Sequence, residues 1–373
     1  MTRCGSDALR HRDLPYNGLA KTPPMGWNGW NHFQTDVDDS VVRSTADAMA
    51  SNGMREVGYL YVNIDDSWQG HRDQKGNLRP NQKFPDMKAL ADYVHSKGLR
   101  LGIYSSPGPR TCAGYEGSYA HENQDAKTFA AWDIDYLKYD WCSADGDMRA
   151  AYQKMGEALQ ATGRPIVFSL SQNDKLAAEN RVWEWGPTTG ANLWRTETDI
   201  SDSWESISKI GFSQNAFAPY AGPGHWNDPD TLEIGNGGLT LEENRTHMTL
   251  WSILAAPLLA GNDLRSVSPE ILAILTNLEV IRIDQDQLGK EGTRALSLGD
   301  IEIWTRPLQG GSSAVAVFNL ANHAESFEIP WASLNIPESA RVRDLWNHAD
   351  LPNTGSINLL QLPGHGAALF RVE

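Results

Sequence analysis

The fold of this chain is constrained most by a repeated alternation of short apolar runs with helix-like segments, from about residue 22 to residue 284. Each run has the length and composition of a strand and ends in polar or aromatic residues. The eight runs are PPMGWNGWN, YLYVNIDDSW, LRLGIYSS, DYLKYDWC, PIVFSLSQ, ANLWRTETD, the stretch before AGPGHWNDPD, and APLLAGND. Eight strand–helix repeats over roughly 260 residues predict a (β/α)₈ barrel, which usually has about this size.

The segments between these runs carry helix signals. Residues 85–98 illustrate the pattern, with Pro85 near the start, apolar side chains on one face and a basic last turn before Gly98. Helices are expected at residues 39–54, 85–98, 123–132, 147–161 and 269–278. A doubly wound open sheet is the alternative, but it requires a glycine-rich phosphate-binding turn after its first strand. GWNGWN matches that turn poorly, and the sequence contains no P-loop.

The sequence changes character after about Gly289. Short runs of alternating apolar and polar residues follow one another, separated by clusters of Gly, Asn and Pro. The runs are IEIWTRP, SAVAVFNL, ESFEIPW, ARVRDLW and AALFRVE. They predict a small antiparallel β-sandwich. We therefore expect an α/β chain with a barrel domain at residues 18–284 and a C-terminal sandwich domain at residues 285–373.

The net charge of −15 argues against two classes of protein. Asp and Glu number 47 against 32 Lys and Arg, whereas proteins that bind nucleic acid or anionic membranes need an excess of cations. A transmembrane helix needs a run of about 18 or more apolar residues, and the sequence contains none. The 14 Trp residues have flat apolar rings that suit the faces of sugars, although Trp equally serves to fill a large core. A sugar-binding protein without catalytic activity therefore stays open.

The N-terminus and the cysteines bear on the compartment. The first seventeen residues contain no apolar stretch, so no signal peptide is visible, and the protein is either cytoplasmic or has lost a presequence. The three cysteines are Cys4, Cys112 and Cys142. They form no C-x-x-C pair and no His/Cys cluster, which argues against a zinc site. At most one disulfide and one free thiol can result.

Carboxylates stand at the ends of several expected strands. They are Asp65, Asp66, Asp140, Asp199 and Asp230. Because catalysis in a barrel occurs at the C-terminal ends of the strands, these side chains are expected to meet at one mouth. A single Asp at such a position is more often a helix N-cap. Paired carboxylates with separated pKa values are, however, what cleavage of a glycosidic bond requires.

A divalent cation is the competing interpretation of this cluster, since several Asp residues could hold Mg²⁺. Lys138 lies two residues before Asp140 and therefore faces the same side of its strand. Arg195 lies close to Asp199 in the sequence. Both cations would compete with a metal, and few His or Glu residues accompany the cluster. We therefore expect neither a metal nor a cofactor.

A series of motifs runs along nearly the whole chain from about residue 20. They are PPMGWN (23–28), WNHF (30–33), NIDDSW (63–68), TCAGY (111–115), YLKYD (136–140), WR (194–195), DI (199–200), AGPG (221–224), WNDPD (226–230) and NDLR (262–265). Together and in this order they resemble glycoside hydrolase family 27, which contains α-galactosidases and α-N-acetylgalactosaminidases. The expected partner is therefore a galactose-containing oligosaccharide or glycan.

The resemblance implies a retaining enzyme that works by two displacements. Asp140, at the family's Lys-Tyr-Asp position, would be the nucleophile. Asp199, at the Asp-Ile position, would be the general acid and then the general base. Lys138 would donate to sugar hydroxyls and keep Asp140 ionised, whereas Asp199 would have to stay protonated near neutral or mildly acidic pH.

The resemblance also implies how the sugar is held. Asp65 and Asp66 would accept hydrogen bonds from the O4 and O6 hydroxyls of galactose. Arg195 would contact the O2 region and help to balance the charge of the pocket. Trp30 would pack against the apolar face or edge of the sugar, and Asp230 would complete the hydrogen bonding around the site.

The cysteines follow the family at one disulfide and depart from it at another. Family members often carry one cysteine after the His-Phe segment and one after the paired Asp, where this chain has Thr35 and Ser67. Cys112 and Cys142 match a second pair at the ends of neighbouring strands, at the pocket rim. We expect them to form a disulfide that stabilises the fold by roughly 3–4 kcal/mol. This implies an oxidising compartment, secreted or periplasmic.

The segment Ser169–Asn173 is the larger departure from the family. The family commonly has Cys-Glu-Trp at its last three positions, and this segment shapes the pocket around the O2 substituent of the sugar. Ser171 and Gln172 are therefore included among the substrate-binding residues, and both a hydroxyl and an N-acetyl group at C2 stay open. A β-L-arabinopyranosidase is a further alternative, but the paired Asp65 and Asp66 favour galactose over a pentose. The aglycone and the oligomeric state are not indicated.

Overall fold

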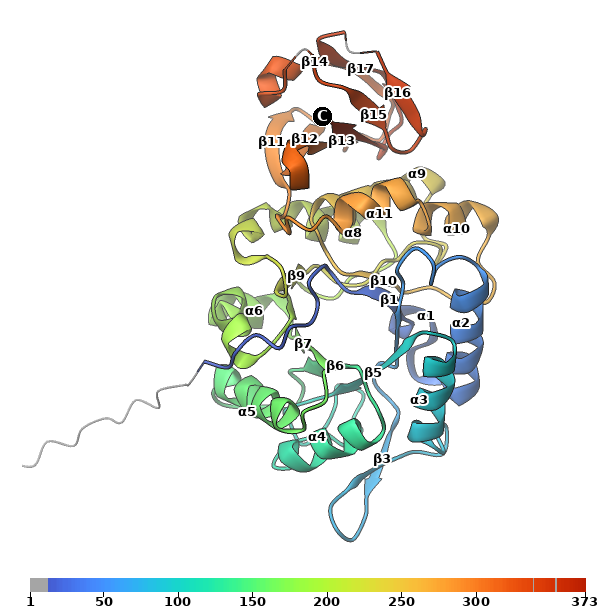
Figure 1. Cartoon of the computed structure of the whole chain (residues 1–373), viewed down its shortest axis with the longest axis vertical. Helices are drawn as coiled ribbons and strands as arrows, with labels where there is room; N and C mark the ends of the chain where they lie inside the picture. Colours follow the sequence, from blue (N-terminus) through green and yellow to red (C-terminus); the bar gives the residue numbers. More distant parts are fainter. Residues whose placement is uncertain (1–12, 338, 353) are drawn as a thin grey trace, which may run out of the picture.

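The computed structural model describes residues 13–337, 339–352 and 354–373, without the side chains of Asp174 and Leu360. A large barrel domain carries a smaller β-domain on one side (Figure 1). Eight parallel strands form one sheet in the order β10-β1-β2-β5-β6-β7-β8-β9. They are β1 (Met25–Asn28), β2 (Tyr61–Asn63), β5 (Arg100–Ser105), β6 (Tyr136–Asp140), β7 (Val167–Ser171), β8 (Leu193–Arg195), β9 (Trp226–Asp228) and β10 (Leu258–Ala260). The predicted barrel is confirmed.

The sheet curls until its two edges meet. Leu232, four residues after β9, forms a parallel bridge with Ala260 of β10. Its N–H donates to Leu259 O and its carbonyl accepts from Gly261 N, both at 2.8 Å. The interior of the barrel is filled by buried side chains, mainly Tyr61, Tyr136, Val167, Leu193 and Trp226. Because this interior is packed, a ligand site has to lie at one end of the barrel.

Helices surround the sheet and alternate with its strands. They are α1 (Trp30–Phe33), α2 (Asp39–Ser51), α3 (Met87–Ser96), α4 (Glu122–Ala131), α5 (Met148–Ala161), α6 (Asp174–Asn180), α7 (Val182–Trp185), α8 (Trp204–Ser213), α9 (Leu241–Ile253), α10 (Pro269–Leu275) and α11 (Leu278–Asp284). The five expected helices are present, and Asp38, Asp86 and Asp147 cap α2, α3 and α5 by accepting from the third helical N–H. Within the described residues, no helix is both long and apolar enough to span a bilayer.

The prediction of a strand before Ala221 is wrong. Gln214–Ala216 and Ala218–Tyr220 form two 3₁₀ turns there, and β9 follows inside the AGPGHWNDPD segment. Pro219 has no N–H for a sheet ladder and lies at the start of the second turn, where that loss costs little. The seventh barrel strand is therefore only three residues long and begins directly after the Gly222–His225 bridge.

The C-terminal domain is antiparallel, as predicted. Its larger sheet has the order β11-β12-β13-β18-β15-β16, and β14 pairs with β17. The strands are β11 (Thr293–Leu298), β12 (Ile301–Pro307), β13 (Ser313–Asn319), β14 (Glu325–Pro330), β15 (Val342–Asp344), β16 (Ala349–Leu351), β17 (Ser356–Leu362) and β18 (Ala367–Val372). A separate hairpin, β3 (Gln69–Arg72) and β4 (Leu78–Pro80), projects from the barrel (Figure 1).

Buried polar groups join the two domains. Arg306 of β12 is fully buried and donates to Ser252 O at 2.8 Å and to Asp284 O at 3.1 Å. Glu291, between α11 and β11, accepts a hydrogen bond from Asn227 Nδ2 of β9 at 2.6 Å. Burial raises the pKa of Glu291 to about 8, although the bond from Asn227 and the charge of Arg306 work in the opposite direction. The segment that links the domains therefore reaches the outer face of a barrel strand.

We predict that Glu291→Gln makes stability less sensitive to pH. The pKa of Glu291 is raised from 4.5 to about 8, so its contribution to stability is complete below about pH 4.5 and is lost as pH rises towards 8. Glutamine keeps the acceptor for Asn227 but cannot ionise. The fall in unfolding free energy between about pH 5 and pH 8, measured by denaturant titration, should shrink by on the order of 2 kcal/mol. The exposed Glu205→Gln is the control, and parallel pH curves for Glu291→Gln and wild type would contradict the prediction.

Candidate active site

The carboxyl ends of the barrel strands bring the predicted charged residues to one mouth. Asp65 and Asp66 lie on the loop just after β2, Asp140 ends β6, Asp199 lies on the loop after β8, and Asp230 follows β9. Charge interactions couple Asp140 to both Asp65 and Asp199, which places these three carboxylates in one electrostatic environment. The expectation that strands far apart in sequence contribute to one cluster is met.

Lys138 is the cation on the β6 side of the mouth. Its Nζ forms an ion pair with Asp65 Oδ2 at 2.8 Å, and Asn28 Nδ2 donates to the same oxygen at 2.7 Å. Burial lowers the pKa of Lys138, but the charges of Asp65, Asp140 and Asp230 outweigh burial and raise it above its ordinary range. The surrounding carboxylates therefore favour the protonated, positively charged form of Lys138.

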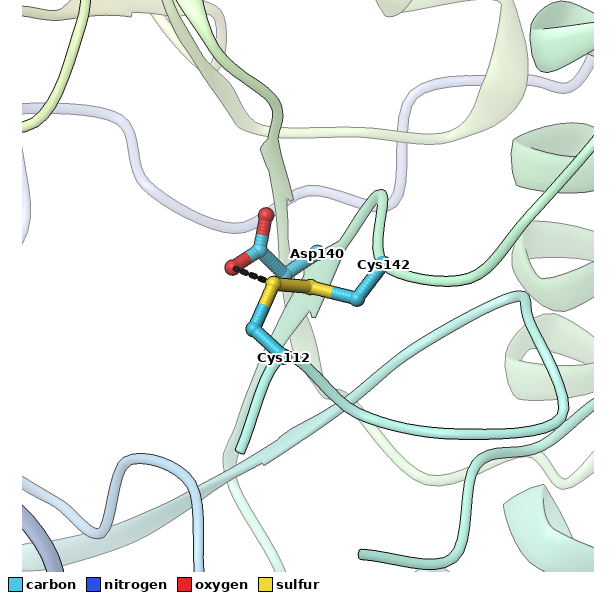
Figure 2. Close-up of side chains that lie close together, drawn as sticks. All are labelled: Cys112, Asp140 and Cys142. Atoms are coloured by element: carbon cyan, nitrogen blue, oxygen red, sulfur yellow. Dashed lines mark hydrogen bonds between the residues drawn. A yellow bond between two sulfur atoms is a disulfide. The ribbon is translucent and has the colours of Figure 1, made fainter. Parts of the chain in front are cut away.

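Asp140 makes its described side-chain contacts through one oxygen. Tyr104 OH donates to Asp140 Oδ2 at 2.8 Å, and Cys112 Sγ lies 3.8 Å from the same oxygen (Figure 2). Burial raises the pKa of Asp140, and the charge of Lys138 and the bond from Tyr104 offset this only in part. Lys138 thus favours the ionised carboxylate, as expected, but the pKa of Asp140 still lies above its ordinary range.

The predicted disulfide between Cys112 and Cys142 is present, with Cα atoms 5.0 Å apart. It joins the loop after β5 to the end of β6, beside Asp140 (Figure 2). Among the described residues, the two sulfurs and Asp140 form one group of three potential metal ligands within 4.8 Å of one another. Disulfide sulfurs carry no thiolate charge, so this group does not fit a metal. Cys4 lies outside the described residues.

The loop after β5 also holds Asp66. Ala113, next to Cys112, donates its N–H to Asp66 Oδ2 at 2.8 Å, and Ser67 N donates to Oδ1 at 2.7 Å. Burial raises the pKa of Asp66 above its ordinary range, and these backbone bonds work against it. The disulfide therefore fixes both the surroundings of Asp140 and a backbone donor to Asp66.

Arg195 is the cation on the β8 side of the mouth. It is buried, and its Nη2 lies 2.8 Å from Asp230 Oδ2 and 3.1 Å from Asp199 Oδ1. The same nitrogen donates to Thr198 O at 2.7 Å, which bends the loop after β8 back over the guanidinium. Burial lowers the pKa of Arg195, but the charges of Asp230 and Asp199 outweigh burial and raise it.

Asp199 behaves differently from the expectation of a protonated acid. Its side chain is 87% exposed at the mouth. Partial desolvation raises the pKa of Asp199, but the charges of Arg195 and Lys138 together outweigh desolvation and hold the pKa below its ordinary range. Without a ligand, Asp199 is therefore an ionised partner of Arg195. The contact with Arg195 thus favours the ionised form of Asp199, whereas the expected general acid has to be protonated.

The remaining predicted residues lie at the same end of the barrel. Trp30 directly follows Gly29 after β1 and is partly exposed at the start of α1. Ser171 ends β7, and its carbonyl accepts from Tyr152 OH at 2.6 Å. Gln172 is buried and donates from Nε2 to Arg195 O at 2.6 Å. Gln172 thus ties β7 to the strand that carries Arg195, and one of its two amide hydrogens makes that bond.

Two residues of the site were not singled out from the sequence. Tyr104 contacts Asp140 and also lies 3.3 Å from Cys142 Sγ, and its position near the end of the run LRLGIYSS is the available signal. Asp228, inside the WNDPD motif, is buried and accepts from Asp230 N at 2.9 Å. Burial raises the pKa of Asp228 to about 6, although Arg195 lowers it.

The fold and the site together define a glycoside hydrolase. The chain matches the family described as "Alpha galactosidase A" over residues 22–286, and the "Alpha galactosidase C-terminal beta sandwich domain" over residues 298–372. It is 46% identical over 349 residues to an α-galactosidase of Cyamopsis tetragonoloba, covering 91% of this chain and 83% of the relative. It is 43% identical to α-galactosidase A of Cellvibrio japonicus, covering 96% and 93% of the two chains.

Solved structures agree with the sequence relatives. The structure of α-galactosidase I from Mortierella vinacea superposes with a TM-score of 0.90 at 36% identity, covering 96% of this chain and 98% of that one. The chain belongs to glycoside hydrolase family 27, the α-galactosidase family. The alternative of a sugar-binding protein without catalytic activity is not needed, because the motifs and both domains match those of enzymes.

We predict that Tyr104→Phe shifts the acid limb of the pH–activity profile upwards. The variant keeps the aromatic ring but removes the hydroxyl that stabilises ionised Asp140, so the pKa of Asp140 rises further. Because a hydrogen bond to a charged group is worth about 1.5 kcal/mol or more, kcat/KM at low pH should fall by about tenfold. The profile of kcat/KM on an aryl α-galactoside measures this. The exposed Tyr119→Phe is the matched control, and an unshifted acid limb for Tyr104→Phe would count against the role of its hydroxyl.

Proposed function

We propose that the chain removes terminal α-linked D-galactose from oligosaccharides or glycans, with retention of configuration, through Asp140 and Asp199. The observation that supports this most is the state of Asp140. Its described contacts are all made by Oδ2, so Oδ1 is available to attack an anomeric carbon. Asp140 also lies in the same charge cluster as Asp199. Two such carboxylates on either side of a glycosidic bond are the requirement for double displacement.

The reaction then proceeds in two steps. In the first, Asp140 Oδ1 bonds to the anomeric carbon while the bond to the leaving oxygen breaks, and Asp199 gives its proton to that oxygen. In the second, water attacks the anomeric carbon, Asp199 takes the water proton, and the ester to Asp140 breaks. Both steps pass through positive charge on the sugar ring, which the surrounding carboxylates stabilise.

Protonation of Asp199 accompanies substrate binding in this proposal. The charge of Arg195 lowers the pKa of Asp199 in the free enzyme. A sugar hydroxyl that accepts a hydrogen bond from Arg195, together with exclusion of water by the sugar, weakens that effect and raises the pKa of Asp199. Binding therefore prepares the acid that the first step consumes.

The sugar itself is held by the residues around this pair. Asp65 and Asp66 accept from the O4 and O6 hydroxyls, and Lys138 donates to hydroxyls beside the nucleophile. Trp30 packs against the apolar face or edge of the ring. The ion pair of Lys138 with Asp65 and the backbone donor to Asp66 support this arrangement, because they orient both carboxylates before the sugar arrives.

We predict that Asp140→Ala abolishes release of p-nitrophenol from p-nitrophenyl α-galactoside. Loss of the nucleophile removes the covalent step, so kcat should fall by about 10⁴-fold or more. The exposed Asp145→Ala, in the loop that follows, should keep wild-type activity. An active Asp140→Ala variant, or a wild-type protein that does not exceed background, would contradict the proposed function.

A second candidate is an α-N-acetylgalactosaminidase. It is suggested by Ser171 and Gln172, which differ from the residues that the family commonly has around the O2 substituent of the sugar. Gln172 donates to Arg195 O, which holds the end of β8 in place but adds no acetamide partner. We therefore predict that wild type prefers the aryl α-galactoside over the aryl α-N-acetylgalactosaminide by about tenfold or more in kcat/KM, since one missing contact is worth 1–3 kcal/mol. The reverse preference would establish the second candidate. An aryl β-L-arabinopyranoside in the same assay tests the pentose alternative.

We further propose a secreted or periplasmic location. The disulfide between Cys112 and Cys142 supports it, because disulfides persist in oxidising compartments. We expect activity to be kept in an oxidising buffer and to decline when a thiol reductant breaks the disulfide, as an assay in both buffers would show.

A further inference from the structure

Ile200, the residue that follows Asp199, is held at both of its backbone polar atoms, its N–H and its carbonyl oxygen. Ile200 N donates to Asp230 Oδ2 at 3.0 Å. Ile200 O accepts from Asn31 Nδ2 at 3.3 Å. Asp230 belongs to the segment after β9, whereas Asn31 belongs to α1 after β1. The segments that follow two different strands, β1 and β9, therefore both bind one residue of the loop that carries Asp199.

Asn31 is itself held by a buried carboxylate. Its Nδ2 also donates to Glu233 Oε1, and Glu233 is 1% exposed. The other oxygen of Glu233 accepts from Asn236 Nδ2 at 2.7 Å, and Glu233 N donates to His247 Nε2 at 3.0 Å. An amide nitrogen carries two donor hydrogens, so Asn31 can serve Ile200 and Glu233 together. Because both neighbours are acceptors, the orientation of the Asn31 amide is determined.

The charges around Glu233 do not explain its burial. Asp230 and Asp202 act on it with the same sign of charge, and the described residues contain no ion pair to Glu233. Asn236, which binds Glu233, also contacts His32 Nδ1 at 3.2 Å. Burial raises the pKa of Glu233 to about 7, and the hydrogen bonds from Asn31 and Asn236 work in the opposite direction. The two amides are therefore the groups that satisfy and orient this buried side chain.

We propose that Asn31, oriented by Glu233, is a positioning residue for Asp199. The inference rests on the proposed role of Asp199 as general acid and base. Arg195 attracts the Asp199 carboxylate from inside the mouth, and Asn31 restrains the following peptide from the α1 side. In the proposed reaction, Asp199 has to lie close to the leaving oxygen in the first step and close to the attacking water in the second. The hydrogen bonds to Ile200 restrict the conformations of the loop and therefore the positions of the Asp199 carboxyl group. Glu233 acts through Asn31 and touches no substrate.

A general acid matters most when the leaving group is poor, and this gives the proposal a specific readout. A dinitrophenolate leaves with little help from a proton, whereas the alkoxide of a sugar needs one. The ratio of kcat/KM for an α-galactosyl disaccharide to that for dinitrophenyl α-galactoside therefore reports how well Asp199 is placed. Both substrates are assayed on one preparation, so the fraction of folded enzyme cancels in the ratio.

We predict that Asn31→Ala lowers this ratio by about tenfold. Asn31→Asp, which keeps the volume and removes the donor hydrogens, should lower it as well. The matched control is Asn236→Ala, which removes a similar donor to Glu233 but no contact to Ile200, and its ratio should stay within about twofold of wild type. An unchanged ratio for both Asn31 variants, or an equal decrease for Asn236→Ala, would overturn the positioning role.

Asp199→Ala separates this proposal from the proposed function. A ratio that falls further in Asp199→Ala than in Asn31→Ala supports both. A fall in Asp199→Ala with none in the Asn31 variants overturns the positioning role and leaves the proposed function intact. No fall in Asp199→Ala overturns the role of Asp199 and with it the inference about Asn31.

Discussion

The site depends on two cations, the buried Arg195 and the partly buried Lys138, that hold a cluster of carboxylates together. Lys138 pairs with Asp65, and Arg195 pairs with Asp230, each at 2.8 Å. Carboxylates gathered at one barrel mouth would otherwise repel one another or take up protons. The ammonium and the guanidinium are desolvated, but the carboxylates around them raise both pKa values. The pocket therefore keeps a fixed pattern of charge before any ligand enters.

The same strands that carry this charge also attach the barrel to its surroundings. Successive residues of a strand point to opposite faces. Arg195 follows Trp194, whose ring Nε1 donates to Asn227 Oδ1 at 2.9 Å on the outer side of β8 and β9. Asn227 in turn donates to Glu291 in the segment that leads to the sandwich. The segment that leads to the sandwich domain thus supports the strands that end at Arg195 and Asp228.

The sequence allowed the barrel, the C-terminal sandwich and the charged residues of the mouth to be predicted, because each follows from a local pattern. Strand periodicity and motifs placed Asp65, Asp140 and Asp230 correctly at strand ends. Tyr104 was missed because a tyrosine near a strand end has no signature of its own, and its contact with Asp140 arises only when β5 and β6 pair. The seventh strand was misplaced because three residues carry too little periodicity to distinguish them from the turns before them.

The ionisation state of Asp199 shows most clearly what a motif leaves undetermined. Its proposed role requires a proton in the complex, yet contact with Arg195 lowers its pKa in the free enzyme. A sugar that engages Arg195 removes part of that effect, so sugar binding and protonation of Asp199 favour each other. This coupling is reciprocal: conditions that protonate Asp199 also strengthen binding of the sugar. The ion pair between Asp199 and Arg195 in the free enzyme can therefore keep Asp199 ionised until a substrate is bound that can receive the proton.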